Sequence, residues 1–162
     1  MTWQPGRDRI GELLDAKELE QVTADERIAQ LLLDDASRHL ATAASALSSE
    51  DLSGAHQLAY DALRKSAASL RATSRGGHVA VQEAVLAQFG LTVRAFRSFG
   101  RIRGARNNFE YPSTVTPGPS ADDVTDAIAT ATQIHHAATT ILEHRPGAVS
   151  HELAMAELLG GS

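Results

Sequence analysis

The chain has 162 residues, of which 43% are hydrophobic, and it carries a formal net charge of −5 with no cysteine. This length suits one domain around one hydrophobic core. The lack of cysteine excludes disulfides and thiolate-bound metals and fits a reducing compartment, so we expect a cytoplasmic location. No run of 18 apolar residues predicts a membrane span, and the first ten residues lack the apolar stretch of a signal peptide. The negative charge disfavours nucleic-acid binding through overall charge alone.

Apolar residues spaced three and four apart predict helices in the first half of the chain. Residues 7–20 can form a short helix within an N-terminal arm, 1–22. A capping box from Thr23 to Glu26 is expected to begin the first long helix. Its apolar face consists of Ile28, Leu32, Ala36, Leu40, Ala43 and Leu47. After a polar turn, a second long helix runs to about Ala72, with an apolar face of Leu52, Ala55, Ala59, Leu63, Ala67 and Leu70.

The second half of the chain shows the same helical period. A glycine pair at 76–77 separates the second long helix from a third helix over 78–89. Residues 91–111 are expected to be mostly helical, with a kink or restart near Gly100 and an end before Pro112. Ser120 is predicted to cap the last long helix, and Asp122 and Asp123 lie in its first turn, where the helix dipole favours negative charge. The apolar face of this helix consists of Val124, Ala127, Ile128, Ala131, Ile134, Ala138, Ile141 and Leu142.

These elements predict an all-α fold, an up-and-down bundle of four to five helices over residues 23–146. Pro146-Gly147 is expected to end the last long helix, and residues 147–162 to form a short helix or tail. No period-two alternation predicts a strand.

Common catalytic and cofactor motifs are absent from the sequence. There is no phosphate loop and no serine-centred elbow, and the seven histidines include no metalloprotease pair, so we expect neither a metal nor a cofactor. His135 falls on an apolar helix face, which favours a buried or half-buried role, whereas its neighbour His136 is expected to point outward.

Basic residues concentrate between Leu91 and Tyr111, which contains five arginines and one acid. This window carries about +4, whereas the rest of the chain, with ten basic and nineteen acidic residues, carries about −9. The arginines are Arg94, Arg97, Arg101, Arg103 and Arg106. A basic strip on an acidic body indicates a local anion-binding surface, and a solvated helix face paired with acids is the alternative.

One end of this segment, RIRGARNNFEYP over residues 101–112, combines several polar side chains. At 100° per residue, Arg103, Arg106, Asn107 and Glu110 fall within about 100° of arc, while Ile102 and Phe109 lie on a different side suited to the core. A guanidinium matches two phosphate oxygens at once, which makes Arg101, Arg103 and Arg106 candidate phosphate ligands. Spacing alone equally allows a simple ion pair between Arg106 and Glu110, worth about 0.3–0.5 kcal/mol on a surface.

The same segment resembles the signature helix of the HEPN superfamily (higher eukaryotes and prokaryotes nucleotide-binding domain). These are small helical bundles whose signature is an Arg, often followed by Asn, with a His four to six residues after the Arg. Arg106-Asn107 matches its start, and the run AHQLAYDALRKSA over 55–67 is similar to an early helix of the family. Gly76-Gly77-His78 resembles the turn that follows. The resemblance covers roughly residues 28–142.

The signature histidine is missing here, because no His occurs between Arg106 and His135. In catalytic members, the resemblance implies metal-independent RNA cleavage in which the His handles protons and the Arg stabilises developing charge. Glu110 and Tyr111 stand in the corresponding region, so the candidate catalytic residues are Arg106, Asn107, Glu110 and Tyr111. A tyrosine, with an ordinary pKa near ~10, is a poor base at neutral pH.

Three functional interpretations follow. The favoured one is a non-catalytic HEPN module of a toxin–antitoxin or defence-type system that binds RNA, a nucleotide or a protein partner. The second is a metal-independent ribonuclease that uses Arg106 at a dimer cleft, and the third is an unrelated helical adaptor. The resemblance also implies a homodimer and a nucleotidyltransferase-type partner that modifies a tyrosine, for which Tyr111 is the counterpart.

Overall fold

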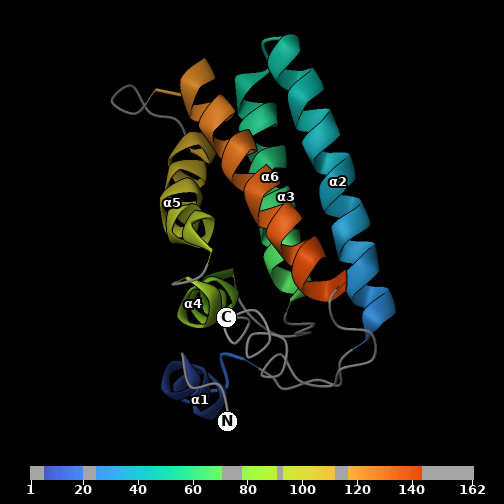
Figure 1. The fold of residues 1–162 in the computed structure, drawn as a ribbon. Coiled ribbons are helices and arrows are strands. Elements are labelled where there is room, and N and C mark those ends of the chain that lie inside the picture. Colours follow the sequence, from blue (N-terminus) through green and yellow to red (C-terminus); the bar gives the residue numbers. More distant parts are fainter. Residues whose placement is uncertain (1–5, 20–24, 71–77, 91–92, 112–116, 144–162) are drawn as a thin grey trace.

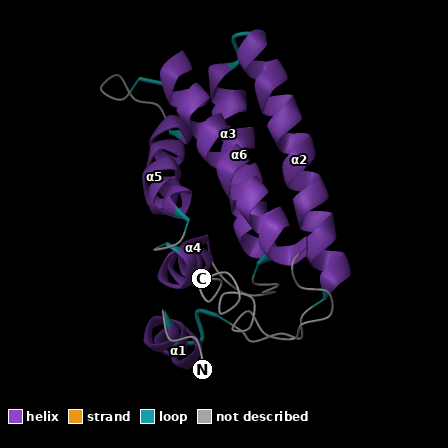
Figure 2. Ribbon diagram, viewed as in Figure 1, coloured by secondary structure: helices purple, strands orange, loops and turns teal. Residues whose placement is uncertain are grey.

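The computed structural model describes residues 6–19, 25–70, 78–90, 93–111 and 117–143. Within these ranges the chain is helical and contains no strand, so the all-α prediction is confirmed (Figure 2). Three long helices, α2 (Glu26–Ser48), α3 (Leu52–Ser69) and α6 (Ala121–Glu143), lie side by side, and α3 and α6 run in the same direction while α2 runs in the opposite one (Figure 1). Helices α4 (His78–Phe89) and α5 (Phe99–Glu110) cover another side, joined by the 3-10 helix η1 (Arg94–Ser98).

The centre of the bundle is α3, since half of its residues are buried. Its small side chains Ala55, Ala59 and Ala62 are fully buried, which allows close approach of neighbouring helices. Lys65 of α3 also reaches α2, where its Nζ lies 2.9 Å from a carboxylate oxygen of Asp35. The predicted apolar face of α3 is buried except at Leu52, which is partly exposed.

Two details of α2 differ from the sequence prediction. Its N-cap is Asp25, whose carboxylate accepts from the backbone N–H groups of Arg27 (2.9 Å) and Ile28 (3.4 Å); Thr23 lies outside the described residues. At its start, α2 buries Ala29 and Leu33, while Ile28 is 49% exposed. Toward the start of α2, the apolar face that contains Ala36 can continue either through Leu33 and Ala29 or through Leu32 and Ile28. Packing on α3 and α6 selects Leu33 and Ala29.

The region around α5 matches the prediction of a restart. The chain forms a 3-10 turn over η1 and begins a new α-helix at Phe99, next to Gly100. Helix α5 ends at Glu110, and Tyr111 adopts φ −120° and ψ 69°, outside the helical region that a following proline disfavours. Pro112 itself lies outside the described residues.

Helix α6 begins with the predicted Ser120 cap. The backbone N–H of Asp123 donates to Ser120 Oγ at 3.1 Å, and the backbone N–H of Ser120 donates to the Asp123 carboxylate at 2.8 Å. This reciprocal arrangement satisfies two amides that the helix leaves without partners. The predicted stop at 146–147, the C-terminal segment 147–162 and the turn at 76–77 lie outside the described residues.

The N-terminal helix α1 (Arg7–Asp15) packs on α4. Leu13 and Leu19 contact Ala80 and Ala84 in a cluster separate from the main core. Gly6 permits this approach, since it has φ +78° and a Cβ at this position would lie 2.6 Å from the backbone of Ala87. None of the described helices combines the length and apolarity that a membrane span requires.

Candidate functional site

Two aromatic residues fix α5 on α3. Phe99 and Ile102 of α5 are buried, and the Phe99 ring meets the ring of Tyr60 edge to face at a centroid distance of 6.4 Å. Tyr60 is only 1% exposed. Because Ile102 points into the core, the adjacent turn of α5 carries Arg103 and Arg106 along the seam with α3.

Arg106 is held in place by both helices. Its Nε donates to Gln57 Oε1 of α3 at 3.1 Å, and its guanidinium carbon lies 5.5 Å from the centre of the Tyr60 ring. On α5, its Nη1 lies 2.8 Å from a carboxylate oxygen of Glu110 and 3.4 Å from the side-chain oxygen of Asn107. The side chain is 21% exposed. The ion pair that the spacing allowed is therefore formed, on a guanidinium that is oriented by its neighbours.

Two further arginines act on the same tyrosine. Burial raises the pKa of the Tyr60 phenol, and the positive charges of Arg106, Arg64 and Arg103 oppose that rise. Arg64 lies one turn after Tyr60 on α3, and Arg103 one turn before Arg106 on α5. We call Arg64, Arg103 and Arg106 the arginine cluster. Arg64 is absent from the residues predicted from the sequence, because the packing of α3 on α5 places it near Arg103 and Arg106.

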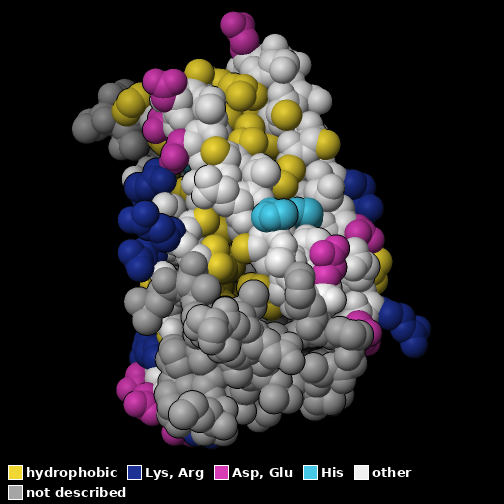
Figure 3. All heavy atoms as spheres, viewed as in Figure 1, with side chains coloured by type: hydrophobic (Ala, Val, Ile, Leu, Met, Phe, Trp, Pro, Cys, Tyr) yellow, Lys and Arg dark blue, Asp and Glu magenta, His cyan; other side chains and the backbone are white. Residues whose placement is uncertain are grey.

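The predicted phosphate ligands do not all converge. Arg101 faces α6, where it lies 2.7 Å from a carboxylate oxygen of Asp126. Two residues along a helix correspond to a rotation of about 200°, so Arg101 and Arg103 leave α5 on nearly opposite sides. Lysine and arginine side chains gather over the side of the molecule where α5 lies (Figure 3). The basic segment thus presents two surfaces, one toward α6 and one along α3.

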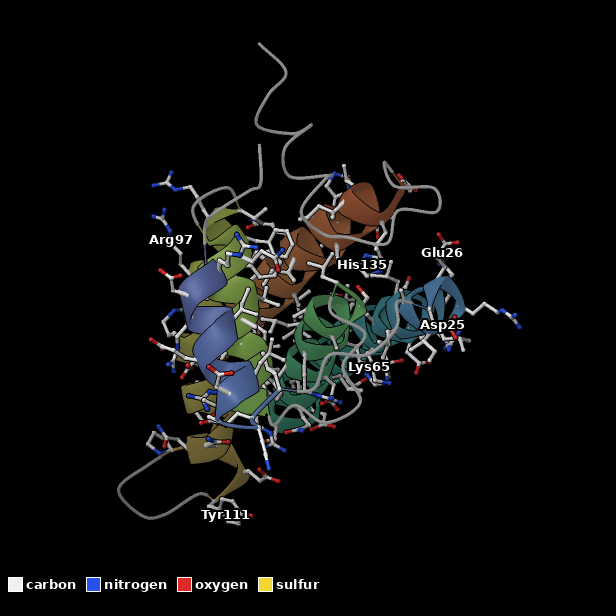
Figure 4. All side chains as sticks on the ribbon, turned by 90° about the horizontal axis from the view of Figure 1, so that it is seen from below. Asp25, Glu26, Lys65, Arg97, Tyr111 and His135 are labelled. Carbon is white, nitrogen blue, oxygen red and sulfur yellow. The ribbon has the colours of Figure 1, made fainter. Side chains whose placement is uncertain are left out.

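Three of the four predicted catalytic residues lie together, and the fourth lies apart. Arg106, Asn107 and Glu110 are in contact, whereas Tyr111 is 78% exposed. Tyr111 lies at one end of the basic segment and Arg97 near the other (Figure 4). Arg97 donates from Nε to the carbonyl oxygen of Gly90 at 2.9 Å, which ties η1 to the end of α4.

A histidine of α3 that contacts α5 is buried. His56 of α3 meets the half-buried Phe109 ring edge to face at 4.9 Å, and its Nδ1 has no hydrogen-bond partner. Burial lowers the pKa of His56, and the charge of Asp123 partly offsets this effect. A neutral, covered imidazole is poorly suited to exchange protons with a ligand.

His135 and His136 follow the sequence interpretation. His135 is half-buried and donates from Nε2 to the carbonyl oxygen of Leu33 at 3.1 Å, which joins α6 to α2 (Figure 4). His136 is exposed. Within the described ranges, no three His, Asp or Glu side chains gather in a way that could hold a metal ion.

The arrangement between α3 and α5 can therefore hold an anion through guanidinium groups. Guanidinium forks provide charge-assisted hydrogen bonds to phosphate oxygens. Comparisons with protein-family models, with curated proteins and with solved structures find no match to this chain.

Proposed function

We propose that this protein is a non-catalytic RNA-binding module of the HEPN type, which holds RNA by its phosphates along the η1–α5 segment. The observation that carries the proposal is the fixed, partly exposed guanidinium of Arg106 beside Arg103 and Arg64. Arg101 extends the basic surface on the other side of α5. The resemblance of Arg106-Asn107 to the HEPN signature supports RNA as the anion and a toxin–antitoxin or defence-type setting.

Charge supports a local mode of binding. The body of the chain is acidic, so an RNA strand is attracted to the basic segment and repelled elsewhere. Each phosphate that an arginine neutralises releases a counterion, and affinity then falls steeply with salt.

Two features argue against RNA cleavage by this protein. Cleavage through the ribose 2′-hydroxyl needs a group that removes its proton. Glu110 is engaged by Arg106 at 2.8 Å, and His56 is covered by Phe109. Neither group is placed as a free base at the exposed edge of the arginine cluster.

A metal-independent ribonuclease is the second candidate, favoured by the contact among Arg106, Asn107 and Glu110. Incubation of total RNA with the protein in EDTA, beside Arg106→Ala and Tyr111→Phe variants, separates the two. The binding module leaves RNA intact in every case. Cleavage by the wild type that is lost in Arg106→Ala establishes the ribonuclease instead.

Binding itself is tested by fluorescence anisotropy with a labelled single-stranded RNA. We expect binding by the wild type, weaker binding by Arg106→Ala, and wild-type binding by Arg27→Ala, which removes an exposed arginine at the start of α2. Absence of RNA binding at low salt by the folded wild type contradicts the proposal and leaves the unrelated helical adaptor.

The HEPN resemblance also supports a homodimer and a nucleotidyltransferase-type partner. Tyr111 suits modification by such a partner, because its side chain is among the most exposed apolar ones described. Sedimentation at micromolar concentration tests the dimer, and a monomer contradicts it.

A further inference from the structure

Two guanidinium groups beside Tyr60 are incompletely satisfied. The Nε atoms of Arg64 and Arg103 are buried and have no hydrogen-bond partner. Among the described residues, Asp61 is an acidic neighbour of Arg64, with a carboxylate oxygen 3.7 Å from its Nε. A buried N–H without an acceptor is costly. An anion received between these side chains supplies the missing acceptors.

The donors come from two helices that pack on each other. Arg64 lies one turn after Tyr60 on α3, and on α5 the guanidinium of Arg106 lies over the Tyr60 ring with Arg103 one turn before it. The side chain of Arg64 is 30% exposed and that of Arg106 is 21% exposed, so the edge of the cluster is open to solvent. The neighbouring Lys65 does not join it, because Asp35 holds it on the side of α2.

The number of arginines indicates whether the cluster suits a phosphodiester or a phosphate monoester. An internal phosphodiester has one negative charge and two free oxygens, whereas a phosphate monoester carries about −1.5 to −2 charges and three acceptor oxygens. The three guanidiniums of the cluster face two acids, Asp61 and Glu110, each of which contacts one arginine. Three guanidiniums on neighbouring turns of two packed helices match the monoester better than a single diester.

We infer that the arginine cluster binds a terminal phosphate monoester at the seam between α3 and α5. This chemistry occurs at the 5′ end of an RNA strand and in a free nucleoside monophosphate. Because the cluster belongs to the RNA-binding surface proposed above, the assignment rests on the proposed function and names its ligand group. Arg64 is the residue that distinguishes this site from the rest of the basic segment.

The experiment compares four probes on the full chain by anisotropy and calorimetry. They are one RNA sequence with a 5′-phosphate, the same RNA with a 5′-hydroxyl, AMP, and adenosine. We expect the wild type to bind the 5′-phosphorylated RNA about tenfold more tightly than the 5′-hydroxyl RNA, as one further charge-assisted hydrogen bond predicts. We also expect AMP to bind and adenosine not to bind.

Substitutions of Arg64 test whether this residue causes the preference for the 5′-phosphorylated RNA. Arg64→Gln is expected to reduce the ratio of the two RNA affinities to about one, and Arg64→Lys, which keeps the charge but loses the fork, to restore only part of it. Arg27→Gln serves as the matched control, because it removes one charge on a distant part of α2 and leaves the ratio unchanged. Circular dichroism verifies that each variant is folded.

The outcomes separate the two proposals. Equal binding of both RNAs by the wild type, with no binding of AMP, overturns the terminal-phosphate site and leaves the RNA-binding function standing. Binding of AMP without binding of either RNA overturns the RNA-binding function and keeps the site. A full phosphate preference in folded Arg64→Gln shows that the terminal phosphate is held elsewhere and overturns the assignment.

Discussion

Arg106 lies over the buried ring of Tyr60, with its guanidinium carbon 5.5 Å from the ring centre. The contact places a positive charge at the boundary between α3 and α5, where Gln57 also accepts from it. A cation over an aromatic face stabilises by about 0.5–2 kcal/mol, depending on its exposure. The same side chain thus contributes to packing and presents charge to solvent.

Replacing Arg106 tests its part in RNA binding. Arg106→Ala is expected to weaken binding and to reduce the slope of log affinity against log salt by about one, the effect of losing one phosphate contact. Arg106→Lys keeps the charge but cannot reproduce the fork to Gln57 and Glu110, so we expect an intermediate affinity. Titrations at four salt concentrations provide the slopes. An unchanged slope in folded Arg106→Ala shows that Arg106 does not contact phosphate.

Glu110 distinguishes binding from catalysis. Glu110→Gln removes the carboxylate that neutralises Arg106, so RNA affinity is expected to rise by about two- to fivefold, the range for a surface ion pair. Asp15→Asn, an equal change of charge on α1, serves as the control and is expected to leave the affinity unaltered. A weaker affinity in Glu110→Gln shows that the carboxylate contacts the RNA directly.

The cap of α6 allows a stability test. Ser120→Ala removes the oxygen that accepts from the Asp123 amide and is expected to lower the free energy of unfolding by about 1 kcal/mol. Ser45→Ala serves as the comparison, because Ser45 is exposed within α2 and its hydroxyl donates to the carbonyl oxygen of Ala41 in the same helix. Chemical denaturation measures both, and equal effects indicate that the cap adds nothing.

His56 gives the stability a pH dependence. Its folded pKa lies below the ordinary 6.5, so the unfolded chain binds its proton more readily. The free energy of unfolding therefore falls as pH is lowered through about 6.5 toward the folded pKa, and it is regained above pH 6.5. We expect His56→Leu to flatten this dependence, while His136→Asn, a change at an exposed histidine, leaves it intact. Parallel slopes in His56→Leu and the wild type contradict the assignment.

Adjacent alanines in α2 test the tightness of the core. Ala43 is fully buried, whereas Ala44 is exposed. Ala43→Leu inserts three carbons into a filled interior and is expected to cost about 1–3 kcal/mol. Ala44→Leu is expected to change stability by less than about 0.5 kcal/mol. Thermal unfolding compares the two, and equal midpoints indicate a loosely packed α2.

Local signals in the sequence predicted most of the fold. The period of apolar residues located α3 and α6, and glycines on either side located α4. The Ser120 cap was found because its geometry depends on four consecutive residues. The predicted apolar face of α2 was wrong at Ile28, which is exposed, whereas Ala29 and Leu33 are buried. The apolar pattern allows either set, and only the neighbouring helices decide between them.

The site was only partly predictable. Arg106, Asn107 and Glu110 share one helix, so their contact follows from spacing within that helix. Arg64 joins them through the packing of α3 on α5, which no local pattern encodes. Arg101 was grouped with Arg103 by closeness in sequence, although a helix turns them apart.

The ion pair between Arg106 and Glu110 also affects which anions can bind to Arg106. A carboxylate attached to the same helix is a tethered competitor, present beside the guanidinium at an effective concentration that a dilute anion cannot match. The affinity of Arg106 for small monovalent anions is therefore low, because each must displace Glu110 with a single charge. A ligand that engages several arginines at once gains more than this cost of about two- to fivefold, so the ion pair favours polyvalent over monovalent anions.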